Sequence, residues 1–193
     1  MKKLLFLLLL VTAIGSFAHA QEKNKSEKKK GFDRSKLFAG GNFGMTFGDY
    51  TLINVSPQIG YRFSEYFAAG TGINFQYISL KERDYNTGAL IDKVSRGVVG
   101  LNIFGRVYPI RQLMLQVQPE LNYTFGKTKY YSTPSFTTNN GTFIVPSLLA
   151  GGGIVFPAGN GGFIISVFYD VLQQPNSPYS NKPFINFGYN FGF

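Results

Sequence analysis

The last eleven residues alternate between apolar side chains and small polar ones. Ile185, Phe187, Tyr189, Phe191 and Phe193 share one parity, and only Asn and Gly stand between them. Because successive side chains of a β-strand point to opposite faces, this segment predicts a strand with one apolar and one polar face. An apolar face of this kind needs a covering layer, and lipid is that layer in a membrane barrel.

Seven further segments upstream alternate in the same way, and no stretch after the first twenty residues shows a helical period. Turn residues separate them. The segments are approximately 36–47, 51–64, 67–77, 94–108, 113–126, 142–156 and 162–172. Together with the C-terminal segment they predict an all-β chain, an eight-stranded antiparallel up-and-down transmembrane β-barrel spanning residues 35–193.

The connections between the predicted strands alternate in length. Those after the second, fourth and sixth strands are tight, whereas 81–93, 127–141 and 173–182 are long and polar. Membrane barrels have short turns on the periplasmic side and longer loops outside. We therefore expect an outer-membrane protein with both termini in the periplasm, whose three long loops are candidate sites for surface ligands.

Three prolines interrupt this pattern, because Pro57, Pro119 and Pro146 lie inside predicted strands. Proline cannot donate to a β-ladder, and a closed barrel has no edge strand to accommodate it. We expect a local β-bulge at each proline.

The N-terminus has the pattern of a secretory signal. Lys2 and Lys3 precede an apolar run from Leu4 to Ile14, and Ala18-His19-Ala20 fits an A-x-A cleavage site. The run is shorter than the roughly 20 residues of a membrane-spanning helix. We expect a signal peptide over 1–20, followed by a basic, disordered periplasmic tail over 21–34.

The residue types that most often carry catalysis are scarce. The only histidine, His19, lies in the predicted signal peptide, and the sequence has no cysteine. The predicted mature chain therefore lacks Ser-His and Cys-His pairs and any His- or Cys-based metal site. We expect no enzymatic activity, no metal and no cofactor. The net charge is +9, but the lysines of the predicted mature chain lie in the tail and loops and the leader indicates export, so we predict no nucleic-acid partner.

Four charged residues have the inward parity of the predicted strands: Arg62, Arg106, Glu120 and Asp170. Buried charges must be paired or hydrogen-bonded, so we predict a lumenal network of ion pairs and hydrogen bonds. Its polar partners on the same parity are Asn54, Gln58, Asn74, Gln76, Asn102, Gln116, Gln118, Asn122 and Asn190. The network could be a gate, but eight strands leave room only for side chains, which favours a plug.

From about residue 36 to the terminal Phe193, the chain resembles the small outer-membrane β-barrels of the Gram-negative cell envelope. These include the OmpA-like transmembrane domain, OmpX-like proteins and the Bacteroidetes outer membrane protein β-barrel domain, within the porin family set. The resemblance rests on the alternating segments and the final aromatic residue. It implies outer-membrane lipid as the surroundings, and recognition of Tyr189, Phe191 and Phe193 by the barrel-assembly machinery.

Three functions fit these observations. The first is a barrel with a structural or surface-interaction role and a lumen plugged by polar side chains. The second is a narrow porin-like channel for ions or small solutes. The third is a soluble, lipocalin-like periplasmic binder whose apolar side chains point inward.

Overall fold

A computed structural model describes residues 33–131, 134–179 and 183–192. The predicted signal peptide, most of the predicted tail and Phe193 lie outside these ranges. A short 3-10 turn, Arg34–Lys36, leads into eight strands. The strands are β1 Leu37–Thr46, β2 Tyr50–Arg62, β3 Phe67–Arg83, β4 Leu90–Ile110, β5 Leu113–Tyr130, β6 Phe136–Ala158, β7 Gly161–Asp170 and β8 Phe184–Phe191. The described ranges contain no helix long and apolar enough to cross a membrane.

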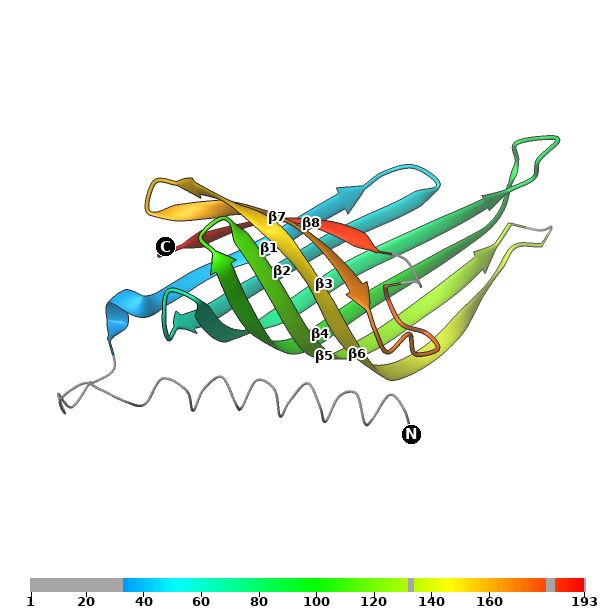
Figure 1. Ribbon diagram of the computed structural model, residues 1–193. Helices are drawn as coiled ribbons and strands as arrows, with labels where there is room; N and C mark the ends of the chain where they lie inside the picture. The colour runs from blue at the N-terminus through cyan, green and yellow to red at the C-terminus, as the bar shows by residue number, and fades with distance from the viewer. Residues whose placement is uncertain (1–32, 132–133, 180–182, 193) are drawn as a thin grey trace, which may run out of the picture. The chain divides into compact units, whose positions relative to one another are not determined.

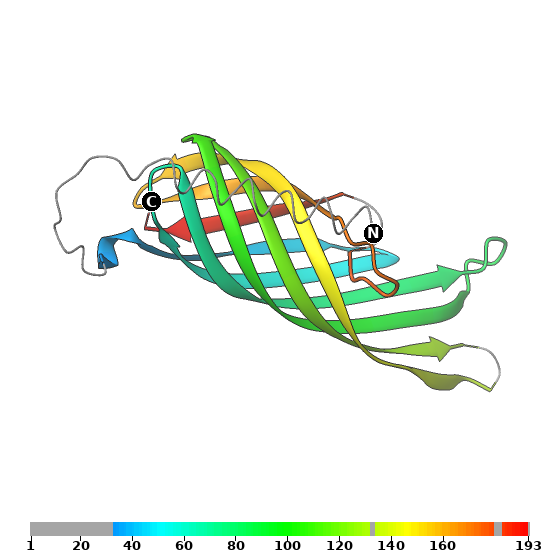
Figure 2. The ribbon, with the colours of Figure 1, turned by 60° about the horizontal axis from the view of Figure 1, so that its bottom comes forward.

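Each strand pairs antiparallel with its neighbours in sequence, and β8 returns to pair with β1. The strands therefore form a closed up-and-down barrel, and their tilt across it is visible in Figure 2. The predicted all-β, eight-stranded architecture is confirmed. Closure is least extensive where the two ends of the barrel sequence meet, because β1 pairs with β8 only between Ala39 and Phe43.

The predicted orientation of the side chains is also confirmed. Leu101 and Leu121 are outside, with 65% and 56% of their surface exposed, whereas their neighbours Asn102 and Asn122 are buried. Because the side-chain period of a strand is two, each strand in register has a single outward set. The barrel thus has an apolar outer surface and a lumen rich in polar side chains.

Two of the long loops predicted from the sequence are in fact mostly strand. β3 continues to Arg83 and β4 begins at Leu90, so the predicted loop 81–93 shrinks to a connection over 84–89. Likewise β5 and β6 take up most of 127–141 and leave only 131–135. The β3–β4 and β5–β6 hairpins consequently project beyond the other strands (Figure 1). Their charged residues were misleading as loop signals, because a strand exposed on both faces accommodates charge well.

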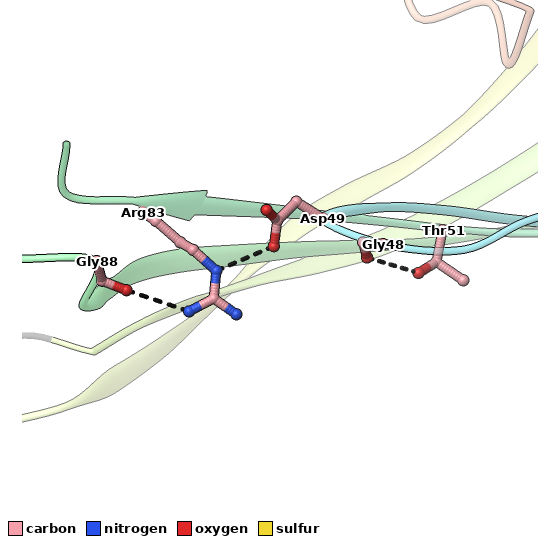
Figure 3. A network of polar contacts seen from close by, with 5 residues as sticks. All are labelled: Gly48, Asp49, Thr51, Arg83 and Gly88. Carbon is pink, nitrogen blue, oxygen red and sulfur yellow. Dashed lines mark hydrogen bonds and ion pairs between the residues drawn. The ribbon is translucent and has the colours of Figure 1, made fainter.

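A polar contact joins the base of this projection to the neighbouring β1–β2 turn. Arg83 Nε donates to Asp49 Oδ1 at 3.0 Å, and its Nη1 donates to the Gly88 carbonyl at 3.2 Å (Figure 3). Within the turn, Thr51 Oγ1 donates to the Gly48 carbonyl at 3.1 Å. The Arg83–Asp49 pair is exposed, so it contributes at most about 1 kcal/mol.

The expectation of bulges at the prolines is wrong. The pairing register is the same on both sides of Pro57, Pro119 and Pro146. The register shifts lie instead at Glu82/Arg83, Val107/Ile110 and Phe125/Lys127, near strand ends. At Pro146 the reason is visible, since β7 pairs with β6 only from Leu149 onward and leaves that edge of β6 without a β7 partner.

Candidate functional site in the barrel lumen

A row of amide and carboxylate side chains runs along the inner face of β5. Gln116, Gln118, Glu120 and Asn122 occupy alternate positions, and all four are buried. Gln116 Nε2 donates to Gln118 Oε1, and Gln118 Nε2 donates to Glu120 Oε1 at 2.6 Å. Asn122 Nδ2 donates to Glu120 Oε2 at 3.2 Å. This β5 row gives the lumen a continuous line of hydrogen bonds, because inward residues on one strand are spaced two apart.

Arg106 lies at the end of the β5 row nearer the short turns, and only 1% of its surface is exposed. Its Nε donates to Gln116 Oε1 at 2.7 Å and its Nη2 donates to Gln58 Oε1 at 2.6 Å. The Asn190 carboxamide, oriented with its oxygen toward Arg106, accepts from Nη1 at 2.7 Å. The guanidinium also lies 4.3 Å from the centre of the Phe104 ring. Amide oxygens and an aromatic face thus satisfy this cation.

Glu120 is the anionic member of the network. In addition to the hydrogen bonds from the Gln118 and Asn122 amides, its Oε2 accepts a hydrogen bond of 2.5 Å from the Tyr179 hydroxyl. Asn74 Nδ2 donates to that same hydroxyl at 2.8 Å, and Ser56 Oγ donates to Asn74 Oδ1 at 2.7 Å. The network therefore crosses the lumen from β5 to β2 and β3 through a side chain of the β7–β8 connection.

Arg106 and Glu120 belong to one hydrogen-bonded network but do not form a direct ion pair. In the barrel register Arg106 faces Gln116, whereas Glu120 faces Asn102. These levels are four residues apart, which corresponds to roughly 13 Å along a strand. Gln116 and Gln118 bridge that gap, so opposite charges are connected through polarised amides rather than by direct contact.

The other two charged residues serve different parts of the barrel. Asp170 holds the β7–β8 connection, since its carboxylate accepts from Leu148 N, Leu172 N and Ser177 Oγ at 3.0, 3.2 and 2.7 Å. Arg62 lies at the short-turn end, 5.2 Å from the centre of the Tyr108 ring. It lines a cavity of about 320 Å³ there.

Tyr179 is the lumenal residue that sequence reasoning missed. It belongs to the predicted external loop 173–182, yet only 9% of its surface is exposed, and its ring stacks on Phe184 at 4.8 Å. Pro178 before it is also buried. This part of the connection therefore folds into the barrel rather than lying on the surface. The connection has no periodicity that could have revealed this.

The lumen near the short turns is apolar rather than polar. Phe38, Phe104, Met114, Val155 and Ile164 belong to one buried hydrophobic cluster. All five have the inward parity and lie toward the end of the barrel where the short turns and the start of β1 are found. We call this part of the interior the apolar zone. The same cluster continues through Leu149 and Phe168 to Tyr179, beside the polar network.

Glycines make room for the large side chains of the apolar zone. A Cβ on Gly60 would lie 2.3 Å from Cζ of Phe38 and 2.9 Å from the Ala69 carbonyl oxygen. We expect Gly60→Ala to lower the free energy of unfolding by about 1–3 kcal/mol, the usual cost of overpacking. Urea titration of the refolded barrel measures this.

The matched control for this substitution is Gly44→Ala, also in the lumen. A Cβ there would make an ordinary contact of 3.9 Å with the Asn54 side chain. We expect its effect to stay within about 0.5 kcal/mol. Equal losses at both glycines would contradict the packing explanation.

No family model matches the chain, and no curated protein matches it. One solved structure with a similar fold is the crystal structure of Neisserial surface protein A (NspA). The two are 12% identical, the alignment covers 81% of this chain and 94% of that chain, and the TM-score is 0.44. The fold assignment rests on the closed register of the strands and does not depend on this likeness.

The lumen offers hydrogen bonding and charge. In the part of the chain that the structure describes, no cluster of three or more His, Cys, Asp or Glu side chains could hold a metal ion. Glu120 and Asp170 do not share a hydrogen-bonding partner, and each is engaged by neutral groups. These side chains fill the lumen and hold the surrounding strands together through hydrogen bonds.

Proposed function

We propose that this protein is an outer-membrane β-barrel with a structural or surface-interaction role and a lumen plugged by its own side chains. The apolar outer surface supports the membrane location, because a soluble barrel would bury those side chains. Exposed aromatics lie toward both ends of it, Phe63, Phe67, Phe156 and Phe163 at the short-turn end and Phe47, Tyr77, Tyr123 and Phe125 at the other. Two such bands match the interfacial girdles of membrane barrels.

The same reasoning favours periplasmic termini. β1 begins and β8 ends at the short-turn end of the barrel, and short turns face the periplasm in barrels of this class. Within that class we propose an OmpA-like or OmpX-like relationship. Tyr189, Phe191 and Phe193 would then be the signal read by the barrel-assembly machinery. Phe191 is 63% exposed, and the Tyr189 ring lies 4.6 Å from it.

The observation that carries the proposal is the way the lumen is filled. A continuous hydrogen-bonded network from Arg106 to Tyr179 spans its polar zone, and the hydrophobic cluster fills the apolar zone. An eight-stranded barrel holds little beyond its own side chains. A residue of the β7–β8 connection adds a further obstruction. The lumen therefore suits a plug better than a pore.

Planar-bilayer recording of the refolded protein tests this proposal. We expect no stable single-channel openings from the wild-type protein, because the hydrophobic cluster and the hydrogen-bonded network fill most of the lumen. Tyr179→Ala should remain silent as well, since Phe38 and Phe104 still close the other end. Reproducible unitary conductance from the wild-type protein would contradict the plug and establish the channel.

A narrow channel remains the second candidate because of one observation. Asn102 and Thr124 are buried, yet Asn102 Nδ2 and Oδ1 and Thr124 Oγ1 have no hydrogen-bonding partner among the described residues. Buried polar atoms of this kind suit a hydrated interior. Conductance that appears only in a Phe38→Ala/Phe104→Ala variant would show that the polar zone is hydrated and that the apolar zone closes it.

The lipocalin-like alternative requires apolar side chains inside and polar ones outside. The exposures have the opposite arrangement, as Leu101 and Asn102 illustrate. A surface-interaction role would use the tips of the projecting hairpins, 84–89 and 131–135, together with the exposed part of 173–182. Of these segments, 84–89 lies at the end of the projecting β3–β4 hairpin, where it can contact molecules outside the membrane.

A further inference from the structure

The projecting part of the barrel has a patch of lysines on its outer face. In the register of β3, β4 and β5, Lys81 is opposite Lys93, and Lys93 is opposite Lys129. Lys127 lies on the same face, one row nearer the barrel, opposite Ser95. We call Lys81, Lys93, Lys127 and Lys129 the lysine patch.

The patch places like charges side by side. Residues directly opposite on antiparallel strands have Cβ atoms about 4.5–5.5 Å apart, and like charges there are destabilising. In the projecting part of these strands, the acidic residues Glu82 and Asp92 are opposite one another on the other face. The four lysines thus lie on the outer face and the two acidic residues on the other, which leaves the outer face strongly cationic. An anion bound on that face would relieve the repulsion.

An apolar groove lies directly beside the lysine patch, between it and the apolar outer surface of the barrel, which we call the apolar belt. The groove has a volume of about 750 Å³, and most of its lining residues have the outward parity. Phe75, Tyr77, Val99 and Phe125 form its apolar walls, and Lys127 lines it at the patch. The Phe125 ring packs over Gly97, where a Cβ would come within 2.5 Å of the ring.

The spacing of these features fits one leaflet of a bilayer. Lys127 and the row of Lys81, Lys93 and Lys129 lie two and four residues beyond the Tyr77–Phe125 level, which is roughly 7 and 13 Å along a strand. A strand tilt near 45° reduces these distances to roughly 5 and 9 Å along the membrane normal. The polar layer of a leaflet is about 5–8 Å thick. Lys127 thus lies at headgroup level when the groove lies among acyl chains, and the long side chains of the other three lysines reach back to the outer edge of that layer.

We propose that this face binds a membrane lipid with a phosphate-bearing headgroup, its acyl chain in the groove and its phosphate on the lysine patch. Charge complementarity selects the headgroup, and the aromatic walls select the chain. The inference rests on the proposed membrane location. It goes beyond that location by assigning a specific lipid site to one side of the barrel.

The test uses the full mature chain refolded in nanodiscs of phosphatidylcholine, with and without phosphatidylglycerol as the anionic probe. Native mass spectrometry counts retained phosphatidylglycerol after detergent release. We expect Lys93→Gln/Lys127→Gln to weaken retention by roughly fivefold per lysine, from the usual contribution of a basic residue near an anionic membrane surface. The control Lys36→Gln/Arg111→Gln makes the same change in charge at the opposite end and should retain lipid normally.

A second pair of measurements tests the groove and the source of the anion. Gly97→Leu displaces the Phe125 ring from its place over Gly97 and so reshapes the apolar wall of the groove. It leaves the lysines in place and should lower retention of phosphatidylglycerol. Inorganic phosphate at matched concentration should not displace the lipid. Equal loss in the control pair, no preference for phosphatidylglycerol, or displacement by phosphate alone would overturn the proposal.

Failure of this inference is distinguishable from failure of the proposed function. Folded membrane barrels migrate differently in SDS gels with and without boiling. A barrel that folds into phosphatidylcholine by that criterion but shows no anionic preference refutes the lipid site alone. A chain that folds into neither bilayer refutes the membrane location as well.

Discussion

Arg106→Ala is expected to lower the free energy of unfolding by about 3–5 kcal/mol, as does removal of one partner from a buried charge network. The side chain is almost fully buried and donates to three amide oxygens, those of Gln58, Gln116 and Asn190. Its loss leaves these acceptors without donors and Glu120 without a balancing charge in the lumen. Urea unfolding of the refolded barrel in lipid vesicles measures the change.

A double-mutant cycle with Glu120→Gln separates charge balance from lost packing. The Gln118 and Asn122 amides can reorganise around a neutral partner, so we expect Arg106→Ala/Glu120→Gln to cost less than the two single changes combined. A coupling of about 0.5–3 kcal/mol is typical of residues in one network. Strict additivity would show that the bridging amides insulate the two charges from each other.

Arg111→Ala is the control for the loss of a guanidinium. Arg111 is highly exposed and its contact with Glu65 is 3.7 Å long, so the change should stay within about 0.5 kcal/mol. Arg106→Lys should recover only part of the loss, because an ammonium cannot reproduce the planar fork that reaches three acceptors. If Arg106→Ala were as mild as the control, the network would not contribute to stability.

Leu121→Arg is expected to cost about 2–4 kcal/mol when the barrel folds into a bilayer, provided the residue lies near the midplane. Leu121 points outward from β5 and is 56% exposed, with Asn122 buried behind it. A guanidinium there would be transferred from water into hydrocarbon. Equilibrium unfolding in phosphatidylcholine vesicles gives the value.

Ile91→Arg is the matched control, because it changes another outward apolar residue to the same cation. Ile91 lies on β4 in the projecting hairpin, beyond the lysine patch and outside the proposed membrane. We expect a cost below about 1 kcal/mol, as near the interfaces of membrane barrels. Equal costs at both positions would show that the apolar belt does not lie in lipid.

The sequence predicted the barrel and the inward side chains well, for a physical reason. A period of two leaves each strand only two orientations, and burial of Gln116, Gln118 and Asn122 beside exposed Leu115 and Leu121 selects one of them. The same constraint predicted β6 despite its weak pattern, as Ile144 and Ile154 are exposed and Val145 and Val155 are buried.

The strand ends and the partners of the charged residues could not be predicted in this way. Lys81, Lys93 and Lys127 have the composition of a loop, and only the register shows that they share one face of extended strands. Parity places Arg106 and Glu120 inside the barrel but does not give their heights along its axis. Those heights follow from the stagger between strands, which alternation does not encode.

Tyr179 illustrates a third limit. Its position depends on the path of a connection with no repeating pattern, held by the Asp170 carboxylate through Ser177 Oγ. The apolar zone was missed for another reason. Phe38, Phe104 and Met114 have the inward parity, but a sequence gives no sign that inward residues near one end will pack into a single cluster.

The short ladder between β1 and β8 has a consequence for the durability of the barrel. The two strands share pairing only from Ala39 to Phe43, whereas β5 and β6 pair along nearly their whole lengths. Loop-closure entropy grows only slowly with chain length, so the number of hydrogen bonds, rather than the separation in sequence, governs how easily this junction opens. We expect local opening of the barrel to begin at the β1–β8 junction. Such opening transiently exposes two complementary strand edges, and another chain could insert a strand between them.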